Sequence, residues 1–121
     1  MPTFTQVPPS IRTSLIWRLN DPAILGSPIW QYSGENLTYT LTVEGSNAPS
    51  SPSAVVYKGR TDVTSTVMPA GSASVSGQVI SLKPLTALVA NSDYSVIVTA
   101  TINSNTEQRK FIVQCVDDKA V

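Results

Sequence analysis

The chain has 121 residues and a formal net charge of zero, and its 13% of charged residues falls below the roughly 25% of ordinary soluble domains. This length fits one domain that buries its own core. No basic run is present, which argues against nucleic acid as a partner. No apolar run is long enough to cross a bilayer, and the proline-broken start lacks the pattern of a secretory signal. We therefore expect synthesis in the cytoplasm and no membrane partner.

Residues 1–27 differ from the rest because prolines interrupt them around one small apolar cluster. Consecutive prolines favour extended backbone and remove amide donors. We predict an extended N-terminal arm with one short strand at residues 14–19 and a turn at 20–22. An arm of this kind can dock on a neighbouring subunit. The predicted contacts are Pro8, Pro9, Ile11, Leu15 and Trp17.

The two tryptophans receive different interpretations. Trp17 lies in the arm beside Arg18, and both residue types are enriched at the energetic centres of interfaces. Its ring either contacts another molecule or packs on its own domain, and the sequence leaves both alternatives open. Trp30 lies beside Tyr32 in a short strand at 29–32, and we interpret it as a core residue.

Residues 28–116 carry the alternation of short strands, and residues 117–121 are predicted to be a short acidic tail. The clearest case places Leu37, Tyr39, Leu41 and Val43 on one face, with threonines on the other. Residues 85–90 show weak helical periodicity, which predicts one turn of helix. The other predicted strands are 54–58, 62–68, 74–76 with 78–82 as a hairpin or a bulged pair, 94–102 and a partner strand around 111–115.

Tyr94 begins the most regular of these strands, after a leucine-rich crossover and a polar turn at 91–93. This arrangement resembles the tyrosine corner of immunoglobulin-like and fibronectin-type sandwiches, in which the hydroxyl bonds to backbone upstream. The number and spacing of short strands favour the same architecture. The predicted fold is therefore all-β: a single Ig-like or fibronectin-type antiparallel β-sandwich with an extended N-terminal arm. The cysteine pair of antibody domains is absent, since the chain has one cysteine.

The sequence offers little catalytic chemistry. It contains no histidine, which removes the commonest general base and metal ligand. Cys115 alternates with Phe111 and Val113, so it is predicted to be a buried structural residue. The adjacent acids Asp117 and Asp118 either bind a cation or form a solvated tail. We predict that the protein is not an enzyme and needs no cofactor or metal. The rival is a small hydrolase that uses carboxylates alone.

The last predicted strand is apolar on both sides. Ile112 and Val116 join Gln114 on the face that should point away from the core. Either the arm covers this face or another subunit does.

Two stretches carry a resemblance to a known class of proteins. "LNDPAILGSPIWQYSGENLTYTLTVEG" (residues 19–45) resembles the opening of small structural proteins of tailed bacteriophages. "SASVSGQVISLKPLTALVANSDYSVIVTAT" (residues 72–101) is similar to their Ig-like closing half. The resemblance implies a virion protein without enzymatic activity.

Within that class, a free-standing small domain fits a capsid decoration or cement protein, which binds the lattice of the major capsid protein or other virion subunits. The resemblance also allows a homo-oligomer on the particle. The alternatives are an Ig-like component of the neck, tail or baseplate, and a bacterial surface module for adhesion or carbohydrate binding.

Overall fold

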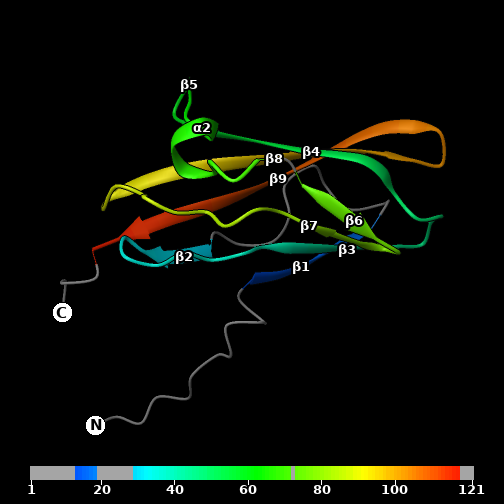
Figure 1. The fold of residues 1–121 in the computed structure, drawn as a ribbon, viewed down its shortest axis with the longest axis horizontal. Coiled ribbons are helices and arrows are strands. Elements are labelled where there is room, and N and C mark those ends of the chain that lie inside the picture. Colours follow the sequence, from blue (N-terminus) through cyan, green and yellow to red (C-terminus); the bar gives the residue numbers. More distant parts are fainter. Residues whose placement is uncertain (1–12, 19–28, 72, 118–121) are drawn as a thin grey trace, which may run out of the picture.

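The computed structural model describes residues 13–18, 29–71 and 73–117, which form two sheets packed against each other (Figure 1). One sheet has the order β1-β3-β7-β6 and the other has the order β2-β9-β8-β4-β5. The first contains β1 (Ser14–Arg18), β3 (Thr40–Glu44), β7 (Val79–Ser81) and β6 (Ser74–Ser76). The second contains β2 (Ile29–Tyr32), β9 (Asn105–Val116), β8 (Ser92–Ile102), β4 (Ser50–Lys58) and β5 (Thr61–Asp62). The predicted all-β sandwich is confirmed.

The strand order of the two sheets resembles that of an Ig-like sandwich. The four-stranded sheet follows the order A-B-E-D, and β4, β8 and β9 correspond to C, F and G. The sheets are mixed, however, whereas the sequence predicted antiparallel pairing throughout. β1 runs parallel to β3, and β2 runs parallel to β9 from the Ile29–Val113 pair to the Tyr32–Val116 pair. Both departures therefore lie at the N-terminal edge strands, which pair with partners distant in the sequence.

The core lies between the two sheets and consists of the inward-pointing side chains of alternate strand positions. In the β8–β9 hairpin this alternation runs through residues 94–102 and 109–115, and a polar turn at Asn103 and Ser104 joins the two strands. Both turn residues have positive φ, as a tight two-residue hairpin turn requires. At the centre the rings of Tyr39 and Phe111 lie 5.3 Å apart across the two sheets.

Tyr94 makes the contact that its position predicts. The backbone N–H of Val89 donates a hydrogen bond of 2.8 Å to the Tyr94 hydroxyl, while the ring is buried. The ring thus fills core volume, and its polar end satisfies a donor in the crossover before β8.

We expect Tyr94→Phe to lower the free energy of unfolding by about 1–2 kcal/mol, because the Val89 N–H loses its acceptor and no cavity forms. Urea denaturation followed by circular dichroism measures the change. Tyr57→Phe is the matched control, because Tyr57 lies half-buried on a different strand. Equal effects of the two substitutions would contradict the role of the Tyr94 hydroxyl.

Two local predictions are wrong. The predicted strand at 62–68 is instead β5 followed by the short helix α2 (Thr64–Val67). The Asp62 carboxylate accepts hydrogen bonds from both the backbone N–H and the hydroxyl of Thr64, and this turn overrides the strand preference of the β-branched residues. The predicted helical turn at 85–90 is irregular backbone, because Leu85 forms a β-bridge to Leu37. No helix in the described part of the chain is long and apolar enough to cross a membrane.

Candidate functional site: the outer face of the five-stranded sheet

The structure describes two of the five predicted arm contacts. Leu15 and Trp17 lie in β1, an edge strand of the sandwich, and their side chains pack with the core of their own chain. The other three predicted contacts, Pro8, Pro9 and Ile11, lie outside the described residues. Of the two alternatives for Trp17, the structure therefore shows the intramolecular one.

Trp17 is fully buried, at 0% exposure, because β1 places it against β9 of the other sheet. The guanidinium carbon of Arg109 lies 5.2 Å from the centre of the Trp17 ring, in cation–π contact. Arg109 is itself 8% exposed; one of its terminal nitrogens donates to the Gln108 carbonyl at 2.8 Å and lies 3.5 Å from the Glu107 carboxylate. This packing fixes β1 to the sandwich.

Trp30 lies on the opposite side of its sheet from the core, and its interpretation as a core residue is wrong. Its side chain is 63% exposed and that of Tyr32 is 46% exposed, while Gln31 between them is fully buried. The Trp30 ring is held in place by a 2.9 Å hydrogen bond from its indole N–H to the Gln114 side-chain oxygen. The exposed ring therefore has a defined orientation and a satisfied polar atom.

Gln31 explains why the strand is turned this way. Its amide nitrogen donates to the carbonyls of Leu85 and Glu35 at 2.7 and 3.0 Å. Its amide oxygen accepts a 2.8 Å hydrogen bond from the Tyr39 hydroxyl. A buried amide with such partners is well satisfied, so Gln31 can point inward and leave both aromatic neighbours outside.

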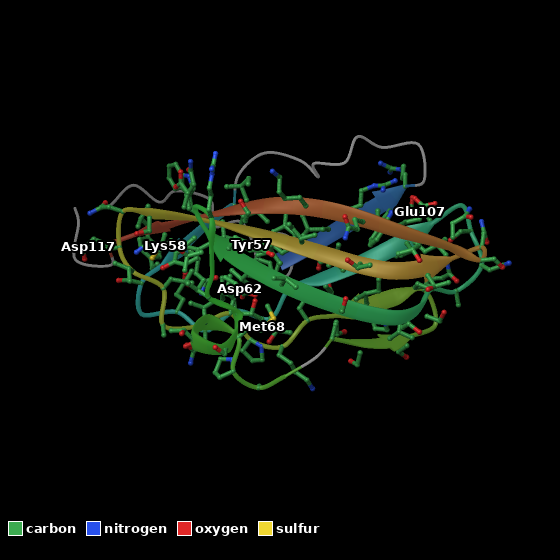
Figure 2. The ribbon with its side chains drawn as sticks, turned by 90° about the horizontal axis from the view of Figure 1, so that it is seen from above. Tyr57, Lys58, Asp62, Met68, Glu107 and Asp117 are labelled. Atoms are coloured by element: carbon green, nitrogen blue, oxygen red, sulfur yellow. The ribbon has the colours of Figure 1, made fainter. Side chains whose placement is uncertain are left out.

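The exposed rings of Trp30 and Tyr32 lie on the same side of the sheet as five half-buried apolar side chains, and we call this group the Trp30 face. In each strand of the five-stranded sheet, residues that alternate with core positions point to the outside, where Tyr57 is visible in Figure 2. Pairing brings Ile112, Ser95 and Tyr57 into one row across the sheet, and Lys110, Ile97 and Val55 into the next. The Trp30 face consists of Trp30, Tyr32, Val55, Tyr57, Ile97, Ile112 and Val116.

The sequence identified part of this face. The detectable signal was the pair of apolar outer positions Ile112 and Val116. A strand that is apolar on both faces indicates that its outer face is covered or contacts another molecule. The contributions of β2 and β4 were missed, since they depend on pairings between strands far apart in the sequence.

The described residues gather no cluster of potential metal ligands. No group of three or more His, Cys, Asp or Glu side chains converges within residues 13–18, 29–71 and 73–117. Cys115 is buried in the core, as its alternation predicts. Asp117 ends the described chain, and Asp118 lies outside it, so the structure tests neither alternative for this pair.

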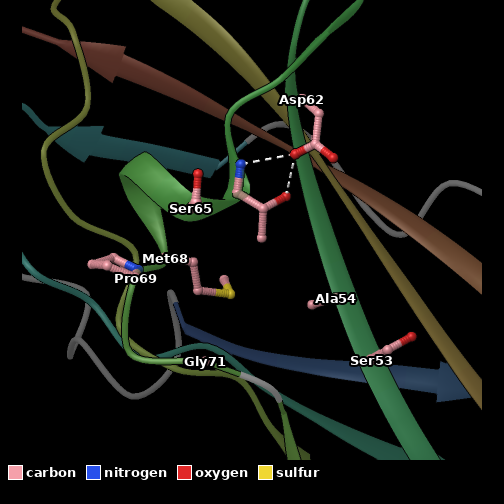
Figure 3. Close-up of a pocket in the computed structure, with 8 residues that line it drawn as sticks. Ser53, Ala54, Asp62, Ser65, Met68, Pro69 and Gly71 are labelled. Carbon is pink, nitrogen blue, oxygen red and sulfur yellow. Dashed lines mark hydrogen bonds between the residues drawn. The ribbon is translucent and has the colours of Figure 1, made fainter.

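A depression of about 630 Å³ lies where α2 meets β4 (Figure 3). Its lining includes Ser53, Ser65, Met68 and the carboxylate of Asp62. The hydrogen bonds from the Thr64 side chain and backbone lower the pKa of Asp62 below its usual value. Asp62 is thus a weak base that already accepts two local hydrogen bonds, which suits a turn-stabilising role better than proton transfer.

A scan against models of known protein families finds no match to this chain, and a search of curated proteins finds none either.

Proposed function

We propose that this protein is a non-enzymatic structural subunit of a tailed-bacteriophage particle, and above all a decoration or cement protein that binds the lattice of the major capsid protein. The observation that carries the proposal is the Trp30 face. Aromatic side chains are enriched, and Lys, Glu and Asp are depleted, at the centres of protein–protein interfaces. A contiguous apolar surface on a folded domain marks a contact site. The virion setting rests on the sequence resemblance.

The N-terminal arm is proposed as a further lattice contact beside the Trp30 face, and the position of β1 limits its length. Because Leu15 and Trp17 belong to the sandwich, the part available to reach another subunit is residues 1–12 with Pro8, Pro9 and Ile11. A short arm on a folded domain enlarges a contact at the entropic cost of ordering it.

The test is co-sedimentation with particles assembled from the major capsid protein of the virus that encodes this chain. We expect saturable binding of the full chain, and a decrease in affinity of more than about tenfold when residues 2–12 are deleted, the equivalent of one or two lost anchor contacts. The deletion keeps β1 and Trp17, so its melting temperature should match that of the full chain. Val89→Ala, which trims an exposed side chain outside both surfaces, is the control. Failure of the full chain to bind any such particle would overturn the proposal.

A second candidate function follows from the same aromatic residues. Two exposed rings two positions apart on an open sheet face could also stack on sugar rings, as in the carbohydrate-binding alternative. Binding of immobilised polysaccharides that Trp30→Ala abolishes would favour this candidate over the virion proposal.

A further inference from the structure

We propose that the depression between β4 and α2 accepts the N-terminal arm of a second copy of this chain, with residues 3–7 of that arm added as a strand to the open edge of β4. The inference rests on the proposed function in one respect, namely that the arm contacts another subunit. It adds the identity of that subunit and the place of the contact.

The first argument is the open edge of β4. The backbone of Val56 points away from β8: its C=O accepts a 2.9 Å hydrogen bond from the Val63 N–H, and its N–H donates a 2.8 Å hydrogen bond to the Thr64 hydroxyl. Backbone direction alternates along an antiparallel strand, so the N–H and C=O of Ala54 also point away from β8. β5 pairs with the last two residues of β4, and no described strand lies beside Ala54 on this side. Unpaired backbone groups at a sheet edge are a template for a further strand.

The second argument is the depression of about 630 Å³ that borders this edge (Figure 3). Its lining includes Ala54 on the strand and Met68 and Pro69 directly after α2. Ala54 packs against the core and Met68 is buried, so both give the depression an apolar lining. A strand on the edge of β4 directs alternate side chains toward this lining. The site therefore combines backbone hydrogen-bonding groups with space for an apolar side chain.

Both ends of the open edge are blocked, so it accepts a short segment. At one end lies Val56, whose backbone groups already have partners in the turn before α2. At the other end Pro52 has no N–H to donate, and Ser51 has a φ of 50° where the register of β4 shifts. The edge therefore fits a strand that lies opposite residues 52–56.

The sequence of the arm contains one segment that matches this edge. Residues 3–7, TFTQV, are rich in strand-forming side chains, and Pro2 and Pro8 limit the segment at its two ends. Phe4 is the only aromatic residue among residues 1–12, and threonines flank it on both sides. When the segment joins β4, the Phe4 ring enters the depression and contacts the Met68 sulfur, a favourable pairing.

The reach of the arm assigns the segment to a neighbouring copy. Residues 8–12 connect it to Thr13, just before β1, and span about 20 Å at full extension. β1 lies at one edge of the four-stranded sheet, and the depression lies beyond the opposite edge, where β6 approaches β4. A path over the outer face of this sheet clears its side chains, crosses three strand spacings and descends the thickness of two packed sheets, about 30 Å in all. The arm therefore falls short of the depression in its own chain.

Each copy then donates an arm at one surface and accepts an arm at another. A head-to-tail contact of this kind generates rings or open chains of copies. A few backbone hydrogen bonds and one aromatic anchor predict weak association in solution, with a dissociation constant of about 100 µM. On a particle, the lattice holds neighbouring copies at high effective concentration, so the same contact links them firmly.

Sedimentation velocity of the full chain, over a concentration series up to about 1 mM, tests the proposal. We expect oligomers whose size grows with concentration. Phe4→Ala should raise the dissociation constant about tenfold or more, because the contact loses its aromatic anchor. Ser65→Trp fills the depression from an exposed position and should have the same effect. Thr66→Trp, exposed on the same helix and outside the lining, is the matched control and should change nothing.

A second groove variant tests the backbone contact itself. Ala54→Pro removes the N–H that the added strand needs, at an edge position where proline is tolerated. Its dissociation constant should also rise about tenfold or more, with an unchanged circular dichroism spectrum. Trp30→Ala, which alters the outer face of the same sheet, should leave the association unchanged.

Mixing two variants tests the head-to-tail geometry. Phe4→Ala keeps an intact groove and Ser65→Trp keeps an intact arm, so each variant alone should stay monomeric. An equimolar mixture should form a one-to-one complex that does not grow further, because one productive contact remains between the two copies.

The outcomes separate this inference from the proposed function. A full chain that stays monomeric throughout the series, oligomers that survive Phe4→Ala and Ser65→Trp, or a mixture that fails to associate would each overturn the arm contact, whatever happens on particles. Oligomers that form as expected while the full chain binds no capsid particle would overturn the proposed function and leave this inference intact.

Discussion

Replacing Trp17 with alanine is expected to remove much of the stability of this domain, while the same change at Trp30 leaves it nearly intact. Trp17 is fully buried between the sheets and covers Arg109, so its loss leaves a large cavity and an exposed cation–π partner. Large-to-small substitutions of this kind lower the free energy of unfolding by about 3–5 kcal/mol. The total free energy of unfolding of a typical domain is about 5–15 kcal/mol.

Trp30 is the matched control because the residue type is identical and only its environment differs. It is 63% exposed, so Trp30→Ala should change the free energy of unfolding by less than about 1 kcal/mol. Urea denaturation followed by circular dichroism compares the two variants. Similar losses for both variants would contradict the inward and outward placement of the two rings.

Gln31→Leu is expected to lower the free energy of unfolding by about 3 kcal/mol, although leucine is apolar and of similar size. The change removes the donor for the Leu85 and Glu35 carbonyls and the acceptor for the Tyr39 hydroxyl. Each buried polar group left without a partner costs about 1–3 kcal/mol of stability. This loss exceeds the stability gained by burying the apolar leucine side chain.

A double-mutant cycle identifies the Gln31–Tyr39 hydrogen bond as part of this loss. Tyr39→Phe alone should cost about 1–2 kcal/mol, and the double variant should lose less than the sum of the singles, because the two groups are then removed together. Gln114→Leu, on the exposed face of the same strand pair, is the control and should cost less than about 0.5 kcal/mol. Additive losses would contradict direct coupling of Gln31 and Tyr39.

The parts of the fold that could be predicted from sequence are those in which local pattern and tertiary environment agree. β3 alternates strictly between apolar and polar positions, and β8 and β9 carry an apolar residue at nearly every inward position. The Tyr94 hydroxyl accepts a hydrogen bond from backbone upstream, as the crossover pattern suggested. At α2 the local pattern and the tertiary environment disagree. Its β-branched residues favour a strand, but the Asp62 carboxylate favours a turn and determines the outcome.

The two tryptophans could not be assigned from the sequence because their environments are set by distant partners. Trp17 is inside because β1 pairs with β3 and faces Arg109, more than ninety residues further along the chain. Trp30 is outside because Gln31 finds its partners in Tyr39 and Leu85. In the strand "IWQY" hydrophobicity alone would place the aromatic residues inside, and only the buried amide network reverses that choice.

The pairing of β2 with β9 also determines when the domain can close during its synthesis. Ile29 cannot pair until Val113, 84 residues later (113 − 29), has been synthesised. A ribosome that adds roughly 5–20 residues per second needs several seconds or more to reach that residue. Throughout that interval the aromatic strand has no edge to join. Its partner β9 becomes available only when the β8–β9 hairpin, which forms between neighbouring segments, has been synthesised. Nascent chains that stall before residue 113 should therefore be the species that need chaperones, with an unpaired aromatic strand as the segment those chaperones protect.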